Sequence, residues 1–292
     1  MNIIGYSDYY DTTLEGQLKF AKEINLNEII IRKYNDKLIY EIDELDILNI
    51  NNDLKREKIN IFALDPLIKK EDYYSEDTLE KYIQTIKIAN SIKVKNIILR
   101  LPKIEDILIE FDTIKIHIDE LLVVAKSNRV NILIKQEEDN NNILAYIIKR
   151  YNDKYLNIIF SPKDAILSQD SAISGYRVLK NYFNTFIAAD IDSLNNPELL
   201  GYGRVDILNL FKRMKRDKYN GNIILDDTFI SFFKDKKNKK VPLLKKLFNA
   251  KSLLDKYIEG YSLRILDENS NELVNIIDIY KNQINVLNIV FN

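Results

Sequence analysis

The 292-residue chain lacks cysteine and tryptophan and has a single histidine, His117. Without cysteine it forms neither disulfides nor thiolate metal sites, a composition typical of the reducing cell interior. No apolar run approaches the roughly 20 residues that span a bilayer. The first residues, MNIIGYSDYYD, lack the basic flank and apolar core of a signal peptide. We therefore expect a soluble, cytoplasmic protein that does not associate with membranes.

An excess of basic charge is also missing. The 43 Lys and Arg residues balance 44 Asp and Glu residues, which leaves a net charge of −1. Proteins that bind nucleic acid usually carry a basic surface, so nucleic acid is not an expected partner. The chain does have ample core material, with 46% apolar residues. Its length fits one α/β barrel domain.

The stretch 199–227, LLGYGRVDILNLFKRMKRDKYNGNIILDD, shows the repeating unit of the chain. A turn with Gly201 and Gly203 precedes an amphipathic helical pattern, which a Tyr-Asn-Gly sequence ends at Gly221. A short apolar strand then leads to two adjacent carboxylates, Asp226 and Asp227. The unit is thus a helix followed by a buried strand of the parallel type.

Short apolar runs of this kind occur eight times, separated by stretches of helical length. Because they are nearly continuous in Ile, Leu and Val, we expect strands buried on both faces. Eight such units predict a (β/α)8 TIM barrel; an open doubly wound sheet is the alternative, but the first loop lacks its glycine fingerprint. The predicted strands are 2–6, 28–32, 59–64, 96–101, 130–135, 156–160, 186–190 and 222–225.

Amphipathic patterns predict the helices between these strands. The first begins after a cap at Thr12 or Thr13 and ends near Asn25. The others are predicted over 35–58, 78–92, 114–127, from the Asn-rich turn at 139–142 to 151, over 174–182, and between the Gly-x-Gly turn and Gly221.

The pattern changes after Asp227. The segment 229–240, FISFFKDKKNKK, pairs an aromatic patch with a basic run, of which 234–240 is interpreted as a solvated loop. A helix over 241–257 would close the eighth unit. A long helix is predicted over 270–291 from one apolar stripe: Leu273, Ile276, Ile277, Tyr280, Ile284, Leu287 and Phe291. We expect one domain, 1–292, with the barrel over about 1–258 and a helical extension over about 259–292, whose stripe covers the barrel bottom or a second subunit in a homodimer.

This pattern resembles the xylose isomerase-like barrel superfamily, which includes sugar phosphate isomerases and epimerases. The resemblance covers roughly residues 2–254. It is carried by GYGRVDILNLFKRMKRDKYNGNIILDD, similar to the family's G-x-G-x-V-D … G-Y-x-G … E ending; by IIFSPKDAI; and by IAAD, in the place of a His-x-Lys-Asp motif.

The resemblance implies a divalent metal held by Glu, Asp, His and Glu at the ends of strands five to eight. In this chain those positions fall on Lys135, Ser161, Ile187 and Asp226, and the His or Asn after the sixth strand falls on Asp164. A cation, a hydroxyl and a hydrocarbon thus replace three expected ligands. Hard divalent cations prefer several oxygen or imidazole ligands, so we expect no metal and no other cofactor.

The same positions supply the candidate site. We expect Lys135, Glu137 and Asp226 to be catalytic, with Lys135 acting as a tuned base, an electrophile or a Schiff-base former, or only neutralising the neighbouring carboxylates. Arg32 and Arg100 end strands two and four and either hold an anionic group of the substrate or pair with Asp65 or Glu137. Further substrate-binding candidates are Ser161, Asp164, Asp190 and Gly203, the last through a backbone N–H near a helix N-terminus.

Two functions remain open at this point. The resemblance favours an isomerase or epimerase that moves a proton next to the carbonyl of a small sugar or sugar phosphate. The alternative is a catalytically inactive barrel that binds small molecules or other proteins, because a fold alone does not determine a function. A repair endonuclease of the same superfamily would need a histidine-rich three-metal cluster, which a single histidine excludes.

Overall fold

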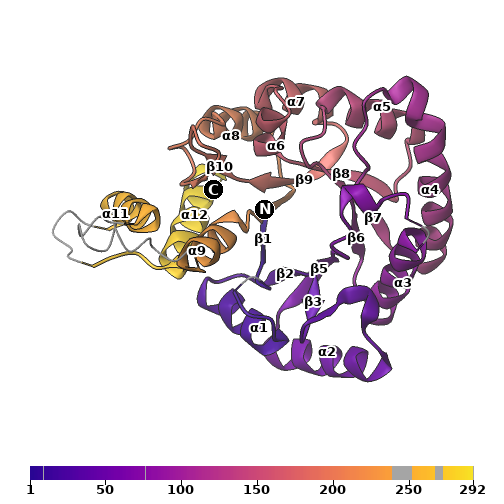
Figure 1. The fold of residues 1–292 in the computed structure, drawn as a ribbon, viewed down its shortest axis with the longest axis horizontal. Coiled ribbons are helices and arrows are strands. Elements are labelled where there is room, and N and C mark those ends of the chain that lie inside the picture. The colour runs from indigo at the N-terminus through magenta and orange to yellow at the C-terminus, as the bar shows by residue number, and fades with distance from the viewer. Residues whose placement is uncertain (9, 76, 239–251, 267–271, 292) are drawn as a thin grey trace.

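The computed structural model describes residues 1–8, 10–75, 77–238, 252–266 and 272–291. Eight parallel strands close into a barrel, in the order β1-β12-β9-β8-β7-β6-β5-β2, with helices outside them (Figure 1). The predicted TIM barrel is therefore confirmed. The barrel strands are β1 (Asn2–Tyr6), β2 (Glu28–Ile31), β5 (Asn60–Leu64), β6 (Asn96–Leu99), β7 (Asn131–Lys135), β8 (Leu156–Phe160), β9 (Phe183–Ala188) and β12 (Asn222–Leu225).

Each strand is buried on both faces, which explains its continuous apolar sequence. One face packs inside the barrel, in a cluster formed by Ile4, Tyr6, Ile30, Ala63, Ile98, Leu133, Ile159, Ile187, Ala189 and Ile224. The other face packs against the helices in a second, larger cluster. Successive side chains of a strand point to opposite faces, so residues two apart share a face.

The helices between the strands begin at polar caps. The Thr13 side chain accepts a hydrogen bond from Gly16 N, as the sequence predicted for Thr12 or Thr13, and Ser161 caps α6. The helices are α1 (Leu14–Glu23), α2 (Glu44–Glu57), α3 (Thr78–Ser91), α4 (Ile107–Asn128), α5 (Asn141–Tyr151), α6 (Pro162–Leu167), α7 (Ala172–Leu179) and α8 (Ile207–Arg216).

Several predicted boundaries were wrong. The segment 35–58 is helical only from Glu44, because a small hairpin, β3 (Lys33–Tyr34) and β4 (Lys37–Leu38), and a 3₁₀ turn, η1 (Ile39–Glu41), precede α2. Helix α4 starts seven residues before the predicted Ile114, where Asp106 caps it. Outside the barrel strands, η2 (Lys70–Asp72) and a second hairpin, β10 (Asp190–Ile191) and β11 (Pro197–Glu198), lie in the connections after β5 and β9.

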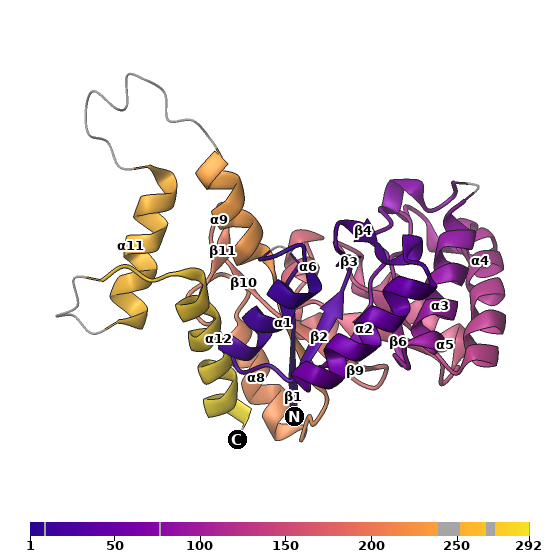
Figure 2. The same cartoon turned by 90° about the horizontal axis from the view of Figure 1, so that it is seen from below.

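The region after β12 differs most from the prediction. Residues 234–238, interpreted as loop, belong to helix α9 (Thr228–Asn238), whereas 239 and 240 lie outside the described residues. Most of the helix predicted over 241–257 also lies outside them; its last residues belong to α11 (Leu253–Ile265), which extends beyond 257. In Figure 2, α9 and α11 lie side by side, and the two helices pack against each other.

The C-terminal helix α12 (Ile276–Phe291) begins six residues after the predicted Ser270, so Leu273 lies outside it and is exposed. Its buried residues are Ile279, Tyr280, Gln283 and Leu287. The Tyr280 ring lies 5.7 Å from that of Phe20 in α1, and the Phe291 ring lies 5.3 Å from that of Phe211 in α8. Helix α12 thus packs between α8 and α1 on the side of the barrel (Figure 1). No helix among the described residues is long and apolar enough to cross a bilayer.

Candidate functional site

A ring of mostly polar residues lies at the carboxyl ends of the barrel strands. On every strand the ring residue follows an interior residue by two positions, so strand geometry turns it toward the barrel axis. In the order of the strands around the barrel (β1, β2, β5, β6, β7, β8, β9 and β12), the ring residues are Asp8, Arg32, Asp65, Arg100, Lys135, Ser161, Ala189 and Asp226. Charges of opposite sign alternate over the first four positions. TIM barrels place their active sites at this end.

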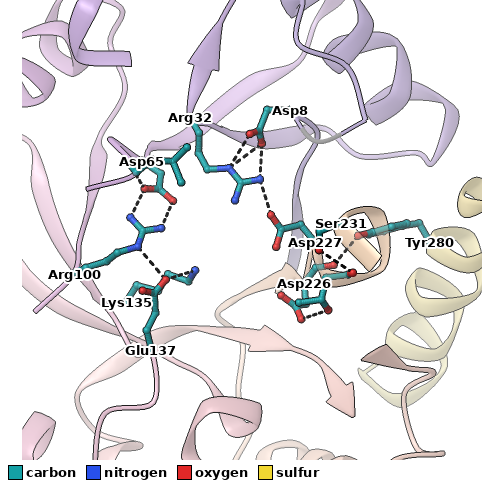
Figure 3. Close-up of polar contacts among 12 residues, drawn as sticks. Asp8, Arg32, Asp65, Arg100, Lys135, Glu137, Asp226, Asp227, Ser231 and Tyr280 are labelled. Atoms are coloured by element: carbon teal, nitrogen blue, oxygen red, sulfur yellow. Dashed lines mark hydrogen bonds and ion pairs between the residues drawn. The ribbon is translucent and has the colours of Figure 1, made fainter. Parts of the chain in front are cut away.

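Two buried arginines hold one half of the ring together (Figure 3). Arg32 contacts Asp8 with Nε and Nη2, at 2.9 and 2.6 Å from Oδ1, and its Nη2 lies 2.5 Å from Oδ2 of Asp227. Arg100 donates two parallel hydrogen bonds to Asp65, of 2.5 and 2.8 Å, and a third of 2.9 Å to Glu137. The sequence predicted Asp65 or Glu137 as the partners of these arginines. Arg100 pairs with both, whereas Arg32 pairs with Asp8 and Asp227 instead. Neither arginine is left with its charge uncompensated.

Lys135 forms an ion pair with Glu137, at 2.8 Å. Burial opposes the lysine charge, but Glu137 and Asp65 outweigh it and raise the pKa of Lys135 above its ordinary value. Burial alone would raise the pKa of Glu137, but the positive charges of Lys135 and Arg100 outweigh burial, so the pKa of Glu137 is lowered. Lys135 is therefore an ammonium and Glu137 a carboxylate at neutral pH.

Asp226 has a different lysine partner. Lys163 of α6 reaches it at 2.9 Å, and the Thr228 hydroxyl donates to the same carboxylate oxygen at 2.6 Å. Burial would raise the pKa of Asp226, but Lys163 outweighs burial and lowers it. Burial would lower the pKa of Lys163; Asp226 and Asp164 instead raise it. Tyr280 of α12 donates to the backbone carbonyl of Asp226 at 2.7 Å, which ties the C-terminal helix to the ring (Figure 3).

Ser161 and Asp164 face each other at the start of α6. The Ser161 hydroxyl accepts from Asp164 N at 3.3 Å and makes a short hydrogen bond to the Asp164 carboxyl group. Ser161 is fully buried, and 8% of Asp164 is exposed. Burial raises the pKa of Asp164, against the opposing effects of Lys163 and Ser161.

Asp190 and Gly203 contact each other, in the loop between β9 and α8. The Asp190 carboxylate accepts hydrogen bonds from Ile191 N, Gly201 N, Gly203 N and Val205 N, at 3.0 to 3.1 Å. A Cβ at Gly203 would lie 2.1 Å from Asp190 Oδ1, so this position requires glycine. The Gly203 N–H predicted to face a substrate anion is thus directed to a carboxylate of the chain itself.

A cavity of about 1120 Å³ opens at the ring. Six of the nine predicted site residues line it: Arg32, Arg100, Lys135, Glu137, Asp164 and Asp226. Ser161, Asp190 and Gly203 are not among the described residues that line it; Ser161 is fully buried and hydrogen-bonded to Asp164.

The prediction missed five charged partners of the mouth: Asp8, Lys70, Asp139, Lys163 and Asp227. Lys70 pairs with Asp139 at 2.5 Å on the cavity wall. Lys163 and Asp227 belong to the sequence motifs on which the resemblance rests. Because each is adjacent to a predicted site residue, Asp164 or Asp226, both could have been predicted from the sequence.

Three of the four positions of the implied metal ligands line this cavity and the fourth, Ser161, is buried, but the four do not form a ligand set. Lys135 and Lys163 bring two ammonium groups next to Glu137 and Asp226, and the Ile187 side chain lines the cavity. Within the described residues there is no group of three or more His, Asp or Glu side chains arranged to hold a metal ion. His117 lies on α4, beside Tyr73 and Tyr74.

No protein-family model matches the sequence, and no curated protein matches it. Solved structures do match. A xylose isomerase domain protein from Planctomyces limnophilus has a TM-score of 0.66 at 13% identity and covers 86% of this chain and 96% of its own. A D-psicose 3-epimerase from Clostridium cellulolyticum H10, solved with D-tagatose, has a TM-score of 0.69 at 12% identity over both whole chains. A probable 3-DHS dehydratase from Bacillus anthracis has a TM-score of 0.62 at 15% identity, covering 82% of this chain and all of its own. The closed eight-stranded barrel and these matches together show that the chain has a TIM-barrel fold similar to that of the xylose isomerase domain protein and the D-psicose 3-epimerase.

Proposed function

We propose that the protein is a sugar isomerase or epimerase that moves a proton next to a carbonyl group and uses lysine ammonium groups where related barrels use a divalent metal. The observation that carries the proposal is the pair of largely buried ammonium groups, Lys135 and Lys163, whose side chains are 16% and 13% exposed on the wall of the mouth cavity. Each is held beside a carboxylate, so each supplies a fixed positive charge in a site of low dielectric. Such charges stabilise the oxyanion that develops when a carbon next to a carbonyl loses a proton.

The residues at the mouth do not fit a divalent cation. A metal held by Asp226 would lie beside the Lys163 ammonium, which is 2.9 Å from that carboxylate. The fifth-strand position is itself an ammonium, Lys135, and the seventh is the hydrocarbon Ile187. Like charges at this separation repel strongly in a buried site. The proposal therefore includes no metal-dependent step, and Lys135 acts in it as an electrostatic partner of the substrate oxygen.

The floor of the cavity suits an uncharged sugar. Its arginines and lysines are all paired with carboxylates, and these pairs present donors and acceptors that hydroxyl groups can join. A phosphate at the floor would have to break a buried ion pair, which costs several kcal/mol. At the rim, Lys33 and Lys69 line the cavity and make no ion pair within the described residues. A phosphorylated sugar would place its phosphate there and its sugar ring at the floor.

The proposal is tested with metal-stripped protein and a panel of ketohexoses and ketopentoses, with and without a terminal phosphate. D-Psicose and D-tagatose belong in this panel because one matching structure is a D-psicose 3-epimerase with D-tagatose. We expect NMR to show isomer or epimer formation in the presence of EDTA, with loss of activity in Lys135→Met and Lys163→Met. Activity that appears only on addition of Mg²⁺ or Mn²⁺ would contradict the metal-free part.

A second candidate function is sugar binding without catalysis. It is favoured by the pKa values of the three residues predicted to be catalytic: that of Lys135 is raised, and those of Glu137 and Asp226 are lowered, so none of them changes protonation near neutral pH. Calorimetric titration with the same sugars separates the two functions. Saturable binding with no conversion and no exchange of carbon-bound hydrogen would select the binding function.

A further inference from the structure

Asp164 lies in the part of the mouth where the barrel strands supply no charge. The ring positions of β8 and β9 are Ser161 and Ala189, between Lys135 on one side and Asp226 on the other. Helix α6 begins here, and its first turn brings Lys163 and Asp164 to the cavity wall. Lys163 forms an ion pair with Asp226, whereas Asp164 forms a hydrogen bond with Ser161. Asp164, which is 8% exposed, thus lines the cavity at this gap in the ring.

The bonding of Asp164 differs from that of four other buried or partly buried carboxylates on the cavity wall. Each of those carboxylates forms an ion pair with a lysine or arginine: Glu137, Asp139, Asp226 and Asp227. Among the described residues, no lysine or arginine nitrogen lies within 4.0 Å of Asp164. Its side-chain partner is the Ser161 hydroxyl, which can donate to a carboxylate or accept from a carboxylic acid. Asp164 can therefore gain and lose a proton without breaking an ion pair.

The surroundings also bring the protonation of Asp164 closer to neutral pH. Burial raises its pKa, and Asp226 acts in the same direction, while Lys163 of α6, Ser161 and Lys135 of β7 oppose the shift. A general base works best when its pKa approaches the working pH. Glu137 and Asp226 are weaker bases, because their cation partners lower their pKa values.

We infer that Asp164 is the catalytic acid–base group of this mouth, which takes a proton from the carbon next to the carbonyl group of a bound sugar and later returns one. The inference rests on the proposed function. In this step the C–H bond breaks and its proton bonds to a carboxylate oxygen of Asp164. The electron pair forms a carbon–carbon double bond, and the carbonyl oxygen takes the negative charge beside the ammonium groups of Lys163 and Lys135. Return of a proton to carbon restores the carbonyl group, and no oxidant or reductant is required.

The test measures exchange of the carbon-bound hydrogen in D₂O, with D-psicose and D-tagatose as probes and ¹H NMR as the readout. Asp164→Asn keeps a hydrogen-bond acceptor for Ser161 but cannot take a proton. We expect its kcat for exchange to fall about 10²- to 10⁴-fold, the usual contribution of a general acid–base group, with KM little changed. The matched control is Asp112→Asn, which removes an exposed carboxylate of α4 that does not line the cavity. Its exchange rate should stay within about twofold of the wild type.

The outcomes separate the inference from the proposed function. Wild-type protein that exchanges no hydrogen of any sugar in the panel would refute both. Wild-type exchange that persists in Asp164→Asn would overturn the role of Asp164 and leave the proposed function intact. If Asp164→Asn fails to fold, Ser161→Ala decides, because it removes the donor that stabilises the ionised carboxylate. The acidic limb of the pH–rate profile should then move to higher pH, and an unmoved limb would overturn the inference.

Discussion

Removal of the Arg100 guanidinium is expected to leave a buried carboxylate without its cation. Asp65 is fully buried and accepts two hydrogen bonds from Arg100, of 2.5 and 2.8 Å, and one from Leu67 N. In Arg100→Met only the last remains. Breaking one side of a buried ion pair costs about 3–5 kcal/mol, because the remaining charge has lost its solvation and its partner. We expect the free energy of unfolding to fall by that amount at neutral pH.

The loss should depend on pH in a defined direction. In the wild type, burial would raise the pKa of Asp65, but Arg100 outweighs burial and lowers it. Its stabilising contribution is therefore present above the unfolded-state pKa of about 3.9 and is lost as the pH falls through the folded-state value. In Arg100→Met, burial dominates and raises the folded-state pKa of Asp65. The loss in free energy of unfolding therefore grows as the pH rises above about 3.9. One proton contributes up to about 1.4 kcal/mol per pH unit, which allows about 2.7 kcal/mol between about pH 5 and pH 7.

Urea unfolding followed by circular dichroism measures both effects. Arg100→Met should lose less stability relative to the wild type at about pH 5 than at about pH 7. Asp65→Asn/Arg100→Met removes the stranded charge and should recover most of the loss. Arg177→Met, at an exposed arginine of α7, is the control and should change stability by less than about 0.5 kcal/mol. A loss below about 1 kcal/mol, or an equal loss at both pH values, would refute this reasoning.

Three further predictions concern the mouth and the C-terminal helix. Elemental analysis of the purified protein should find no stoichiometric divalent metal; one tightly held ion per chain that disappears in Asp226→Ala would contradict the charge assignment. NMR titration should place the pKa of Lys135 above the free-lysine value of about 10.4. The contribution of Lys135 to stability is then complete below that value and is lost as the pH rises through the folded-state pKa. A pKa near neutrality would contradict this prediction. Deletion of 276–292 should lower the melting temperature steeply, because each buried apolar side chain of α12 contributes about 1.5–3 kcal/mol; an unchanged melting temperature would show that α12 adds little.

The sequence predicted the barrel because strands buried on both faces are continuous apolar runs, which are easily recognised. Runs such as Ile29–Ile31 and Ile97–Leu99 have no polar alternation, and the strand count follows from them. The short hairpins were missed because two-residue strands have too few positions to show a period. Helix α9 was missed because its first turns, FISFF, are apolar on several sides and its end is basic, so no single stripe stands out.

The site was predicted in part for a different reason. Strand ends can be read from sequence, and six of the residues named there line the cavity. Which cation pairs with which carboxylate depends on the closing of the barrel. The closure places Arg32, after the second strand, between Asp8 and Asp227, which follow the first and the last barrel strands. Lys163 lies in the first turn of α6, beyond the strand end, and was missed although its neighbour Asp164 was named from the family motif.

Each ring residue lies two positions beyond an interior residue of its strand. The charges of the ring can therefore differ from those of a metal site while the packing inside the barrel stays the same. Interior side chains such as Leu133 and Ile224 pack in one apolar cluster, whereas the charged groups of Lys135 and Asp226 form ion pairs with other residues of the mouth. The mouth must instead remain balanced in charge. Lys135→Glu alone would place a carboxylate beside Glu137 while Lys163 still neutralises Asp226, so it would add repulsion without creating a metal site. A metal site would also require removal of the Lys163 ammonium, which makes Lys163 the residue that most firmly sets this mouth apart.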